Sequence, residues 1–179
     1  MKPERLARRV IYESSWVNLY VDKVRFPGGL VLDEHHLLDF PLGAVASIVE
    51  DEHGNILLVS VGRYTAGTTR WELPAGGMEA GESEIQTAKR EVLEETGYTS
   101  EEHELIYSFY PMGGIANKRF HIVRCRSIKL EQDFDHSEVV ETRWFSRAEV
   151  RQMLRDQEFS DGLSLTGLLL WLQDSSHEA

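Results

Sequence analysis

The sequence has almost no cysteine and no long uninterrupted hydrophobic run. Cys125 is the single cysteine among 179 residues, so the chain can form neither an internal disulfide nor a zinc site built from several cysteines. The longest apolar stretch, residues 163–172, is interrupted by Ser, Thr and Gly, which excludes a membrane span there. The first ten residues contain no apolar segment of the kind found in secretion signals. We therefore expect a cytoplasmic protein with no membrane partner.

Positive charge is also scarce. The 19 Lys and Arg residues are outnumbered by 30 Asp and Glu residues, which gives a net charge of −11. Proteins that bind phosphate backbones along a surface carry the opposite sign, so we exclude nucleic acid as a partner. Hydrophobic residues make up 41% of the chain and charged residues 27%, which is the balance of an ordinary globular protein.

Alternation of apolar and polar residues predicts two β-hairpins early in the chain. The first joins residues 17–26 to 30–38 through a Pro-Gly-Gly turn, and the second joins residues 44–49 to 56–61. Two hairpins in series exceed what one face of a small sheet needs. The expected domains are therefore a separate β region at residues 1–40 and a main domain at residues 41–179.

Capping residues predict a well-defined helix at residues 83–96. Ser83 and Gln86 have the spacing of a capping box, and Gly97 suits the left-handed residue that ends a helix. The preceding segment, residues 71–77, is so rich in Gly and Pro that we expect a structured loop. The order of elements predicts an α+β fold around a mixed sheet. The remaining predictions are strands at residues 105–110, 120–125 and 139–145, the first two of them paired, and helices at residues 146–154 and 163–173.

Most of the negative charge is concentrated on and around the helix at residues 83–96. Residues 72–104 contain ten acidic and two basic residues. At about 100° per residue, Glu94 and Glu95 each fall within about 60° of Glu91, beside an apolar stripe. Carboxylates that share a face near the core repel one another and need a compensating cation. Arg90 can pair with Glu94, but one arginine cannot neutralise three carboxylates.

Two explanations are open for three carboxylates that share one helix face with a single arginine. Oxygen ligands without a nearby histidine or thiol favour a hard divalent ion, so Mg²⁺ or Mn²⁺ fits this helix better than zinc. The alternative is a solvated helix face with many salt bridges, which is the usual explanation of a glutamate-rich helix.

The spacing from Gly76 to Tyr98 favours the metal. Gly76 is followed after five residues by Glu82, and after seven more by Arg90-Glu-Val-Leu-Glu-Glu-Thr-Gly-Tyr98. This pattern resembles the signature of the Nudix hydrolases at every constrained position. The resemblance implies an enzyme that hydrolyses a nucleoside diphosphate linked to another moiety. It also implies an α/β/α sandwich, in which a mixed sheet lies between helices, with an N-terminal β-hairpin region added to it.

The resemblance also implies roles for the residues of the signature. Glu91 and Glu95 would be direct metal ligands, and Glu94 would reach a metal through water. The backbone carbonyl of Ala75 would be a further ligand, and Arg90 would orient the carboxylates. Glu91, Glu95 and Arg90 therefore count among the catalytic residues. The cofactor implied is Mg²⁺, with Mn²⁺ as a substitute, because such ions neutralise a diphosphate and lower the pKa of an attacking water.

Residues outside the signature resemble one branch of that family. Arg63-Tyr64 and the segment 71–77 are similar to the pyrophosphatases of ADP-ribose and other nucleoside diphosphate sugars. The resemblance implies that Arg63 holds the diphosphate and that Glu72 and Glu82 belong to the substrate-binding residues. Glu82 is expected to pair with the helix or with a further ion. The alternative for Arg63 is an exposed arginine at the end of a strand.

A glutamate in a later loop is expected to be the general base or an additional metal ligand, as in many enzymes of this branch. Glu138 is the candidate, and Glu141 is the alternative. The polar segment 131–138 has the composition of a loop that could close over a substrate. An ordinary solvated loop would have the same composition.

By the same resemblance, the N-terminal β region is expected to mediate a homodimer and to contact the base. Trp16 and Tyr20 are the aromatic candidates for stacking on the base, and burial of Trp16 in the core is the alternative. Gly113 and Asn117 depart from the ADP-ribose pattern. ADP-ribose, GDP-mannose and similar nucleoside diphosphate sugars therefore all stay open as substrates.

Two further functions stay open. The same fold and metal chemistry could act on dinucleoside polyphosphates, coenzyme derivatives or damaged nucleotides. A non-catalytic Nudix-fold regulator that binds nucleotides is the other alternative, although such modules generally lose signature carboxylates and this chain has kept them. The partner is a small molecule in each case.

Overall fold

The computed structural model describes residues 2–174, and the chain divides into two compact units. The first unit consists of Met1–Gly43 and Phe109–Arg119, and the second of Ala44–Ser108 and Phe120–Ala179. A segment from the second half of the chain thus belongs with the N-terminal β region. Sequence analysis did not predict this, because the contacts that place the segment there join residues 77 positions apart.

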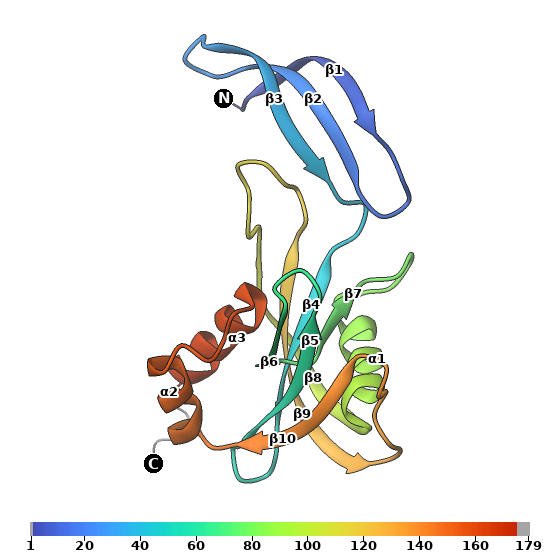
Figure 1. The fold of residues 1–179 in the computed structure, drawn as a ribbon, viewed down its shortest axis with the longest axis vertical. Coiled ribbons are helices and arrows are strands. Elements are labelled where there is room, and N and C mark those ends of the chain that lie inside the picture. The colour runs from blue at the N-terminus through green and yellow to red at the C-terminus, as the bar shows by residue number, and fades with distance from the viewer. Residues whose placement is uncertain (1, 175–179) are drawn as a thin grey trace. The chain divides into compact units, whose positions relative to one another are not determined.

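The first unit is built on an antiparallel sheet of three strands (Figure 1). β1 (Glu4–Tyr12) pairs with β2 (Asn18–Arg25), and β2 pairs with β3 (Val31–Asp39). The second and third strands are the predicted first hairpin. β1 is absent from the predictions because all nine of its residues are exposed, so it lacks the alternation on which such predictions rely.

The segment inserted from the second half of the chain attaches to the end of β3. The Leu38 N–H donates to the Ile115 carbonyl at 2.7 Å. Asn117 Oδ1 accepts from the Phe40 N–H at 2.7 Å, and Asn117 Nδ2 donates to Asp39 Oδ1 at 2.6 Å. Backbone and side-chain hydrogen bonds together hold this segment against the three-stranded sheet.

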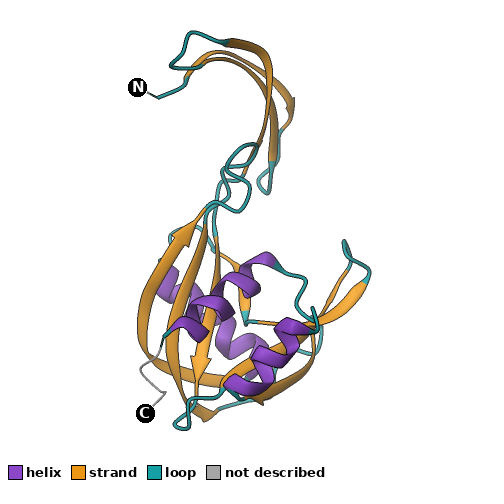
Figure 2. Cartoon of the chain, turned by 90° about the vertical axis from the view of Figure 1, so that its left-hand side faces the viewer, coloured by secondary structure: helices purple, strands orange, loops and turns teal. Residues whose placement is uncertain are grey.

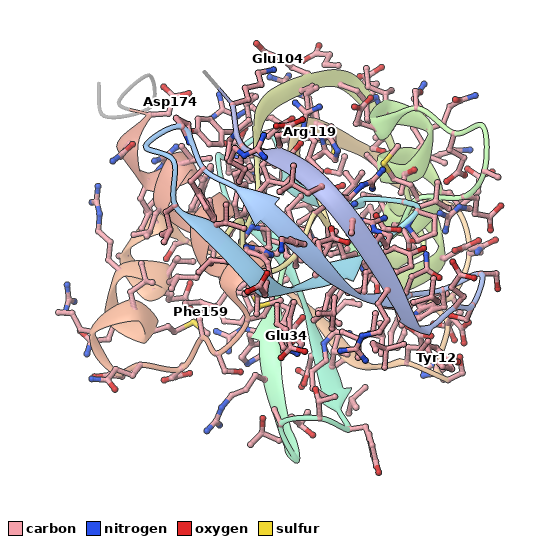
Figure 3. The ribbon with its side chains drawn as sticks, turned by 90° about the horizontal axis from the view of Figure 1, so that it is seen from above. Tyr12, Glu34, Glu104, Arg119, Phe159 and Asp174 are labelled. Carbon is pink, nitrogen blue, oxygen red and sulfur yellow. The ribbon has the colours of Figure 1, made fainter. Side chains whose placement is uncertain are left out.

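Charged side chains of the first unit pair across its strands. Arg8 contacts Asp22 at 2.7 Å, and Arg9 contacts Glu34 at 3.2 Å. Figure 3 shows the side chains along these strands, with Glu34 of β3 and Tyr12 at the end of β1 labelled. In these pairs each carboxylate has a cation of its own. Further pairs join Lys23 to Asp33 and Arg25 to Glu4.

The second unit contains a seven-stranded mixed sheet. Its strands are β4 (Ala44–Glu50), β5 (Ile56–Arg63), β6 (Thr68–Glu72), β7 (Ala75–Gly77), β8 (Tyr98–Phe109), β9 (Phe120–Leu130) and β10 (Val139–Phe145). The order is β10-β5-β4-β9-β8, with β6 paired to β5 and β7 paired to β4. β4 and β9 run parallel, whereas β10, β6 and β5 form antiparallel pairs. The sheet is therefore mixed, as predicted.

Helices cover both faces of this sheet (Figures 1 and 2). α1 (Glu84–Thr96) lies on one face, and α2 (Arg147–Arg155) and α3 (Gly162–Gln173) lie on the other. The predicted α/β/α sandwich is confirmed, and each predicted helix is found within one residue of its expected ends. Ser83 caps α1 in a capping box, and Gly97 ends it with φ of 74°. Within residues 2–174 no helix is both long and apolar enough to cross a bilayer.

The prediction of a loop at residues 71–77 is wrong. β6 and β7 extend into this segment as short strands, and Pro74 lies between them. The Pro74 carbonyl accepts from the Ser47 N–H at 2.8 Å, which ties the break to the neighbouring strand β4. Proline needs no partner for its own nitrogen, so it can separate two strands without leaving a donor unpaired. Composition alone could not show this, because the pairing partners are distant in sequence.

Candidate active site

The second unit brings the signature residues together beside α1. Arg63 ends β5, Glu72 ends β6, and Ala75 begins β7. α1 packs against β4 and β7, so its inner face meets the backbone of the Gly-rich segment. The loop at residues 131–138 leads into β10, and its last three residues line a cavity together with Arg63.

Arg90 is the centre of the charged network on α1. Its Nε donates to Glu82 Oε1 at 2.9 Å, and its Nη1 donates to Glu91 Oε1 at 2.7 Å and to Glu94 Oε2 at 3.2 Å. Its Nη2 also donates to the Gly77 carbonyl at 2.9 Å. The bond to Glu82 is the main cause of the raised pKa of Arg90, and it helps to lower the pKa of Glu82 to about 2. One guanidinium thus orients three carboxylates and links α1 to β7.

Glu91 lies directly against the backbone of Gly76. A Cβ atom at residue 76 would be 1.8 Å from Glu91 Oε1, so any side chain there would displace the carboxylate. Glu91 is only 9% exposed, and burial raises its pKa although Arg90 opposes the rise. The close approach is the physical reason for a glycine at the start of the signature.

Glu95 has the least compensated charge of the site. It is 7% exposed, and it accepts a hydrogen bond from the Ala75 N–H at 2.8 Å. Burial raises the pKa of Glu95 to about 8, and the nearby charge of Glu91 adds to the rise. A buried carboxylate that favours its protonated form at neutral pH is typical of a functional site.

These residues fit a hard divalent cation. Glu91 and Glu95 offer buried carboxylate oxygens, and oxygen is the ligand that Mg²⁺ and related ions prefer. A cation at this place would balance the charge that Arg90 leaves uncompensated. The side chains of residues 2–174 do not form a ready-made cage of three Asp, Glu, His or Cys ligands, and Glu91 and Glu94 are instead bonded to Arg90.

Arg63 and Glu72 form a bidentate ion pair at the ends of β5 and β6. Arg63 Nη2 donates to Glu72 Oε2 at 2.6 Å, and Arg63 Nε donates to Glu72 Oε1 at 3.0 Å. The Glu72 side chain is 1% exposed, whereas that of Arg63 is 43% exposed. Glu72 therefore contacts Arg63 with both carboxylate oxygens, and its place among the substrate-binding residues stays a prediction. The open side of the guanidinium can donate hydrogen bonds to a phosphate or carboxylate.

Glu138 lies within electrostatic range of two carboxylates of α1. Burial is the main cause of the raised pKa values of Glu91 and Glu95, and the negative charge of Glu138 adds to both. Glu138 also lines a cavity of about 520 Å³ that has Arg63 on its wall. Glu141 lies on β10, is exposed and does not line this cavity. The position of Glu138 on the wall of this cavity favours it over Glu141 as the candidate for the general base or additional metal ligand. The role of Glu138 in the reaction stays a prediction.

Trp16 and Tyr20 belong to the first unit and differ in exposure. Trp16 lies between β1 and β2 and is 77% exposed, so the alternative that it is part of the core is wrong. Tyr20 is 8% exposed, its hydroxyl donates to Glu13 at 3.0 Å, and the Arg8 guanidinium lies 4.0 Å from its ring centre. Of the two, Trp16 has the more accessible ring. Stacking of either ring on a base stays a prediction.

Sequence analysis missed residues that hold the site in place. Thr87 Oγ1 donates to Glu82 Oε2 at 2.8 Å. Ser164 of α3 accepts from the Leu73 N–H at 3.1 Å, and a Cβ at Gly167 would be 2.5 Å from the Leu73 side chain. A signal for Ser164 was available, because a serine within an apolar helix must find a hydrogen-bond partner if it is buried.

Comparisons with known proteins agree with this geometry. The family model described as NUDIX domain matches residues 41–164. The chain belongs to the NUDIX family. It is 32% identical over 162 residues to the CMP-5'-(N-acetyl-N-hydroxy-3-aminopropyl)phosphonate hydrolase of Streptomyces rubellomurinus (strain ATCC 31215). The matched region covers 90% of this chain and 78% of that protein. It is also 29% identical over 164 residues to the ADP-ribose pyrophosphatase of Bacillus subtilis (strain 168), and the matched region covers 90% of this chain and 88% of that protein.

A solved structure supports the fold. The crystal structure of an ADP compounds hydrolase matches 99% of this chain and 97% of its own, with a TM-score of 0.84 and 17% identity. Together the matches confirm the Nudix fold, the similarity to the ADP-ribose pyrophosphatase branch and the class of enzyme, a Nudix pyrophosphatase. Nudix hydrolases generally depend on a divalent metal and act on small-molecule nucleoside diphosphates, so these two broader predictions are confirmed as well.

Proposed function

We propose that this Nudix protein hydrolyses the diphosphate bond of a nucleoside diphosphate sugar. A water oxygen forms a bond to one phosphorus while the bridging P–O bond breaks, and the products are a nucleoside monophosphate and a sugar phosphate. The observation that carries the proposal is the pair of buried carboxylates, Glu91 and Glu95, which Arg90 cannot neutralise together because it is bonded to Glu91 and not to Glu95.

Mg²⁺ is the proposed cofactor, and Mn²⁺ is expected to substitute for it. Glu91, Glu95 and the Ala75 carbonyl would hold the ion, and Glu94, whose side chain is 52% exposed, would reach it through water. A bound divalent ion neutralises the diphosphate and lowers the pKa of a water molecule. Arg90 contributes by keeping the carboxylates in place.

The remaining side chains bind the substrate and move the proton. Arg63 binds the diphosphate through the open side of its guanidinium, which Glu72 holds from behind. Glu138 accepts the proton of the attacking water, because it lies close to the carboxylates of α1. Glu82 supports the site by fixing Arg90.

ADP-ribose is the first substrate to test, and GDP-mannose is the second. The relative from Bacillus subtilis is named an ADP-ribose pyrophosphatase, and the relative from Streptomyces rubellomurinus is named the hydrolase of a CMP conjugate. Purified protein should be assayed with both compounds side by side in Mg²⁺, with product identification by chromatography. We expect turnover of at least one compound and its loss in EDTA. No turnover of either compound would contradict the proposed substrate class.

The same assay separates the alternative functions. Dinucleoside polyphosphates, coenzyme derivatives and oxidised nucleotides would be turned over in place of the sugars if the protein served another Nudix reaction. A regulator would bind one of these compounds tightly without hydrolysing it. The intact set of signature carboxylates argues against a regulator.

We also infer that residues 1–40 form a region that mediates a homodimer and contacts the base, ahead of the Nudix domain at residues 41–179. Two observations support this. β1 is an exposed edge strand with the apolar side chains Val10, Ile11 and Tyr12 on its surface, and Trp16 is open to solvent. Analytical ultracentrifugation of the full chain should give the mass of two chains, and a monomer would contradict the inference. The cytoplasmic location stays a prediction.

A further inference from the structure

The loop that carries Glu138 is bonded to the C-terminal end of α1. The Asp135 N–H donates to the Glu94 carbonyl at 2.8 Å, and the Glu131 N–H donates to the Gly97 carbonyl at 2.9 Å. The last carbonyls of a helix have no partner within the helix itself. The loop therefore supplies a donor that α1 needs, and the helix and the loop are joined at that end.

Gly97 allows this close approach. A Cβ atom at residue 97 would be 2.1 Å from the carbonyl oxygen of Gln132, so a side chain there would push the loop away. The residue also has φ of 74°, which side chains disfavour. The glycine thus ends α1 and admits the backbone of the loop at the same point.

Phe134 anchors the loop on its other side. Among residues 131–138, all of which the structure describes, Phe134 alone is not exposed. Its ring packs against a buried cluster made of Val59, Val61 and Val139. Val59 and Val61 belong to β5, the strand that ends at Arg63. The anchor therefore connects the loop to the strand that carries the proposed diphosphate-binding residue.

The turn between Phe134 and Glu138 is closed by its own hydrogen bonds. The Val139 N–H donates to the Asp135 carbonyl at 3.2 Å, and the Ser137 N–H donates to Asp135 Oδ1 at 2.8 Å. These bonds make the turn a compact unit. A displacement of Phe134 would therefore be passed on to Glu138 and change its position relative to the carboxylates of α1.

We propose that Phe134 is a positioning residue, which holds Glu138 at the active site by packing against Val59, Val61 and Val139. The inference rests on the general-base role proposed for Glu138. In this account the loop is held on α1 and β5 before a substrate binds. Phe134 itself touches neither the substrate nor the reacting water.

The test is a double-mutant cycle with turnover as the readout. The variants are Phe134→Ala, Phe134→Leu, Glu138→Gln and the double variant Phe134→Ala/Glu138→Gln. kcat, KM and the Mg²⁺ activation constant are measured with the nucleoside diphosphate sugar that the wild type hydrolyses. The thermal midpoint of each variant is recorded, so that every assay is run on folded protein.

Phe134→Ala is expected to lower kcat by about tenfold or more, while KM and the Mg²⁺ constant change by less than about twofold. Phe134→Leu should keep most of the activity, because leucine can fill the same apolar cluster. In the Glu138→Gln background the alanine substitution should have no further effect on kcat, since no base remains to be positioned.

Met153→Ala is the control for stability. Met153 is a buried side chain of α2, a helix that supplies no side chain to the site. This variant should lower the thermal midpoint and leave kcat unchanged. If it lowered kcat as much as Phe134→Ala does, lost stability would explain both effects and the proposal would be wrong.

The two possible failures are distinguishable. Wild-type turnover in Glu138→Gln would overturn the role of Glu138 in the proposed function and the positioning role with it. A strong loss in Glu138→Gln together with an unchanged kcat in Phe134→Ala would overturn the positioning role alone. An equal loss from Phe134→Ala with and without Glu138 would also overturn it, because the residue would then act independently of the glutamate.

Discussion

The two units of the molecule both contain many charged side chains, but they balance them differently. In the three-stranded sheet of the first unit, charged residues pair across strands, as Arg9 pairs with Glu34. At the active site of the second unit, Arg90 donates hydrogen bonds to three carboxylates, whereas Glu95 accepts one from a backbone N–H and is attracted by the charge of Arg63, which is bonded to Glu72. Exposed ion pairs contribute about 0–1 kcal/mol each to the free energy of unfolding. A buried carboxylate without a cation is destabilising instead.

The difference teaches that a high density of charge does not by itself mark a functional site. A buried carboxyl group with no cation bonded to it is the stronger sign, because groups with strongly shifted pKa values cluster at functional sites. Substitutions can remove the buried carboxylate from the second unit or break the ion pairs of the first.

Glu95→Gln is expected to have the largest effect. Turnover in Mg²⁺ should fall by about 10³-fold, because a metal ligand is lost. The same substitution removes a buried carboxyl group that must either take up a proton or bury its charge on folding, so the metal-free protein should become more stable by about 1–3 kcal/mol. Urea unfolding in EDTA measures this gain.

Glu94→Gln is the matched control, since the Glu94 side chain is 52% exposed. It should change the free energy of unfolding by less than about 0.5 kcal/mol. A Glu95→Gln protein that is less stable than the wild type in EDTA would contradict the claim of an uncompensated charge.

Arg63→Met should raise the KM for the diphosphate substrate by about tenfold or more, because the guanidinium that binds the diphosphate is lost. It also leaves Glu72 buried and unpaired, which costs about 2–3 kcal/mol of stability, less than for a fully buried pair because Arg63 is partly exposed. The double variant Arg63→Met/Glu72→Gln should regain most of the stability but not the low KM. Recovery of both would mean that Arg63 only supports the fold.

The burial of Glu95 without a bonded cation should also make the stability of the protein depend on pH. The pKa of Glu95 is about 8 in the folded metal-free protein, and its ordinary value is 4.5. The unfolded chain thus releases this proton at a lower pH than the folded protein does. The free energy of unfolding should therefore fall as pH rises from about 4.5 to about 8. In EDTA, the stability advantage of Glu95→Gln over the wild type should widen across this range, and a constant difference would contradict the assignment.

The smallest effect is expected in the first unit. Arg9→Ala removes an exposed pair with Glu34, so unfolding in urea should show a loss below about 0.5 kcal/mol. Arg8→Ala serves as the contrast, because its partner Asp22 has a side chain only 7% exposed and would be left without a cation. Its loss should be larger than that of Arg9→Ala. Equal losses of unfolding free energy in the two variants would show that burial of the carboxylate does not decide how much these ion pairs contribute to stability.

The parts of the fold that could be predicted from the sequence are those specified locally. Ser83 and Gln86 predicted the start of α1, and Gly97 predicted its end. The spacing of the signature likewise placed Glu91, Glu94 and Glu95 on one helix, because their separation in the chain fixes their angles.

The parts that could not be predicted depend on distant contacts. β7 exists because it pairs with β4, and Glu95 is buried where α1 packs against these two strands, next to Ala75 twenty positions away. A helical wheel could not tell that Glu95 is buried and Glu94 exposed. The anchoring of Phe134 in a cluster with β5 was also hidden, since composition describes residues 131–138 only as a polar loop.

Binding of Mn²⁺, followed by electron paramagnetic resonance in parallel with hydrolysis of ADP-ribose or GDP-mannose, tests the central claim most directly. The wild type should bind Mn²⁺ and hydrolyse one of these compounds over the same range of metal concentration, and Glu95→Gln should lose both properties while remaining folded. Hydrolysis that persists in EDTA, or a Glu95→Gln protein that binds Mn²⁺ and turns over like the wild type, would contradict the account.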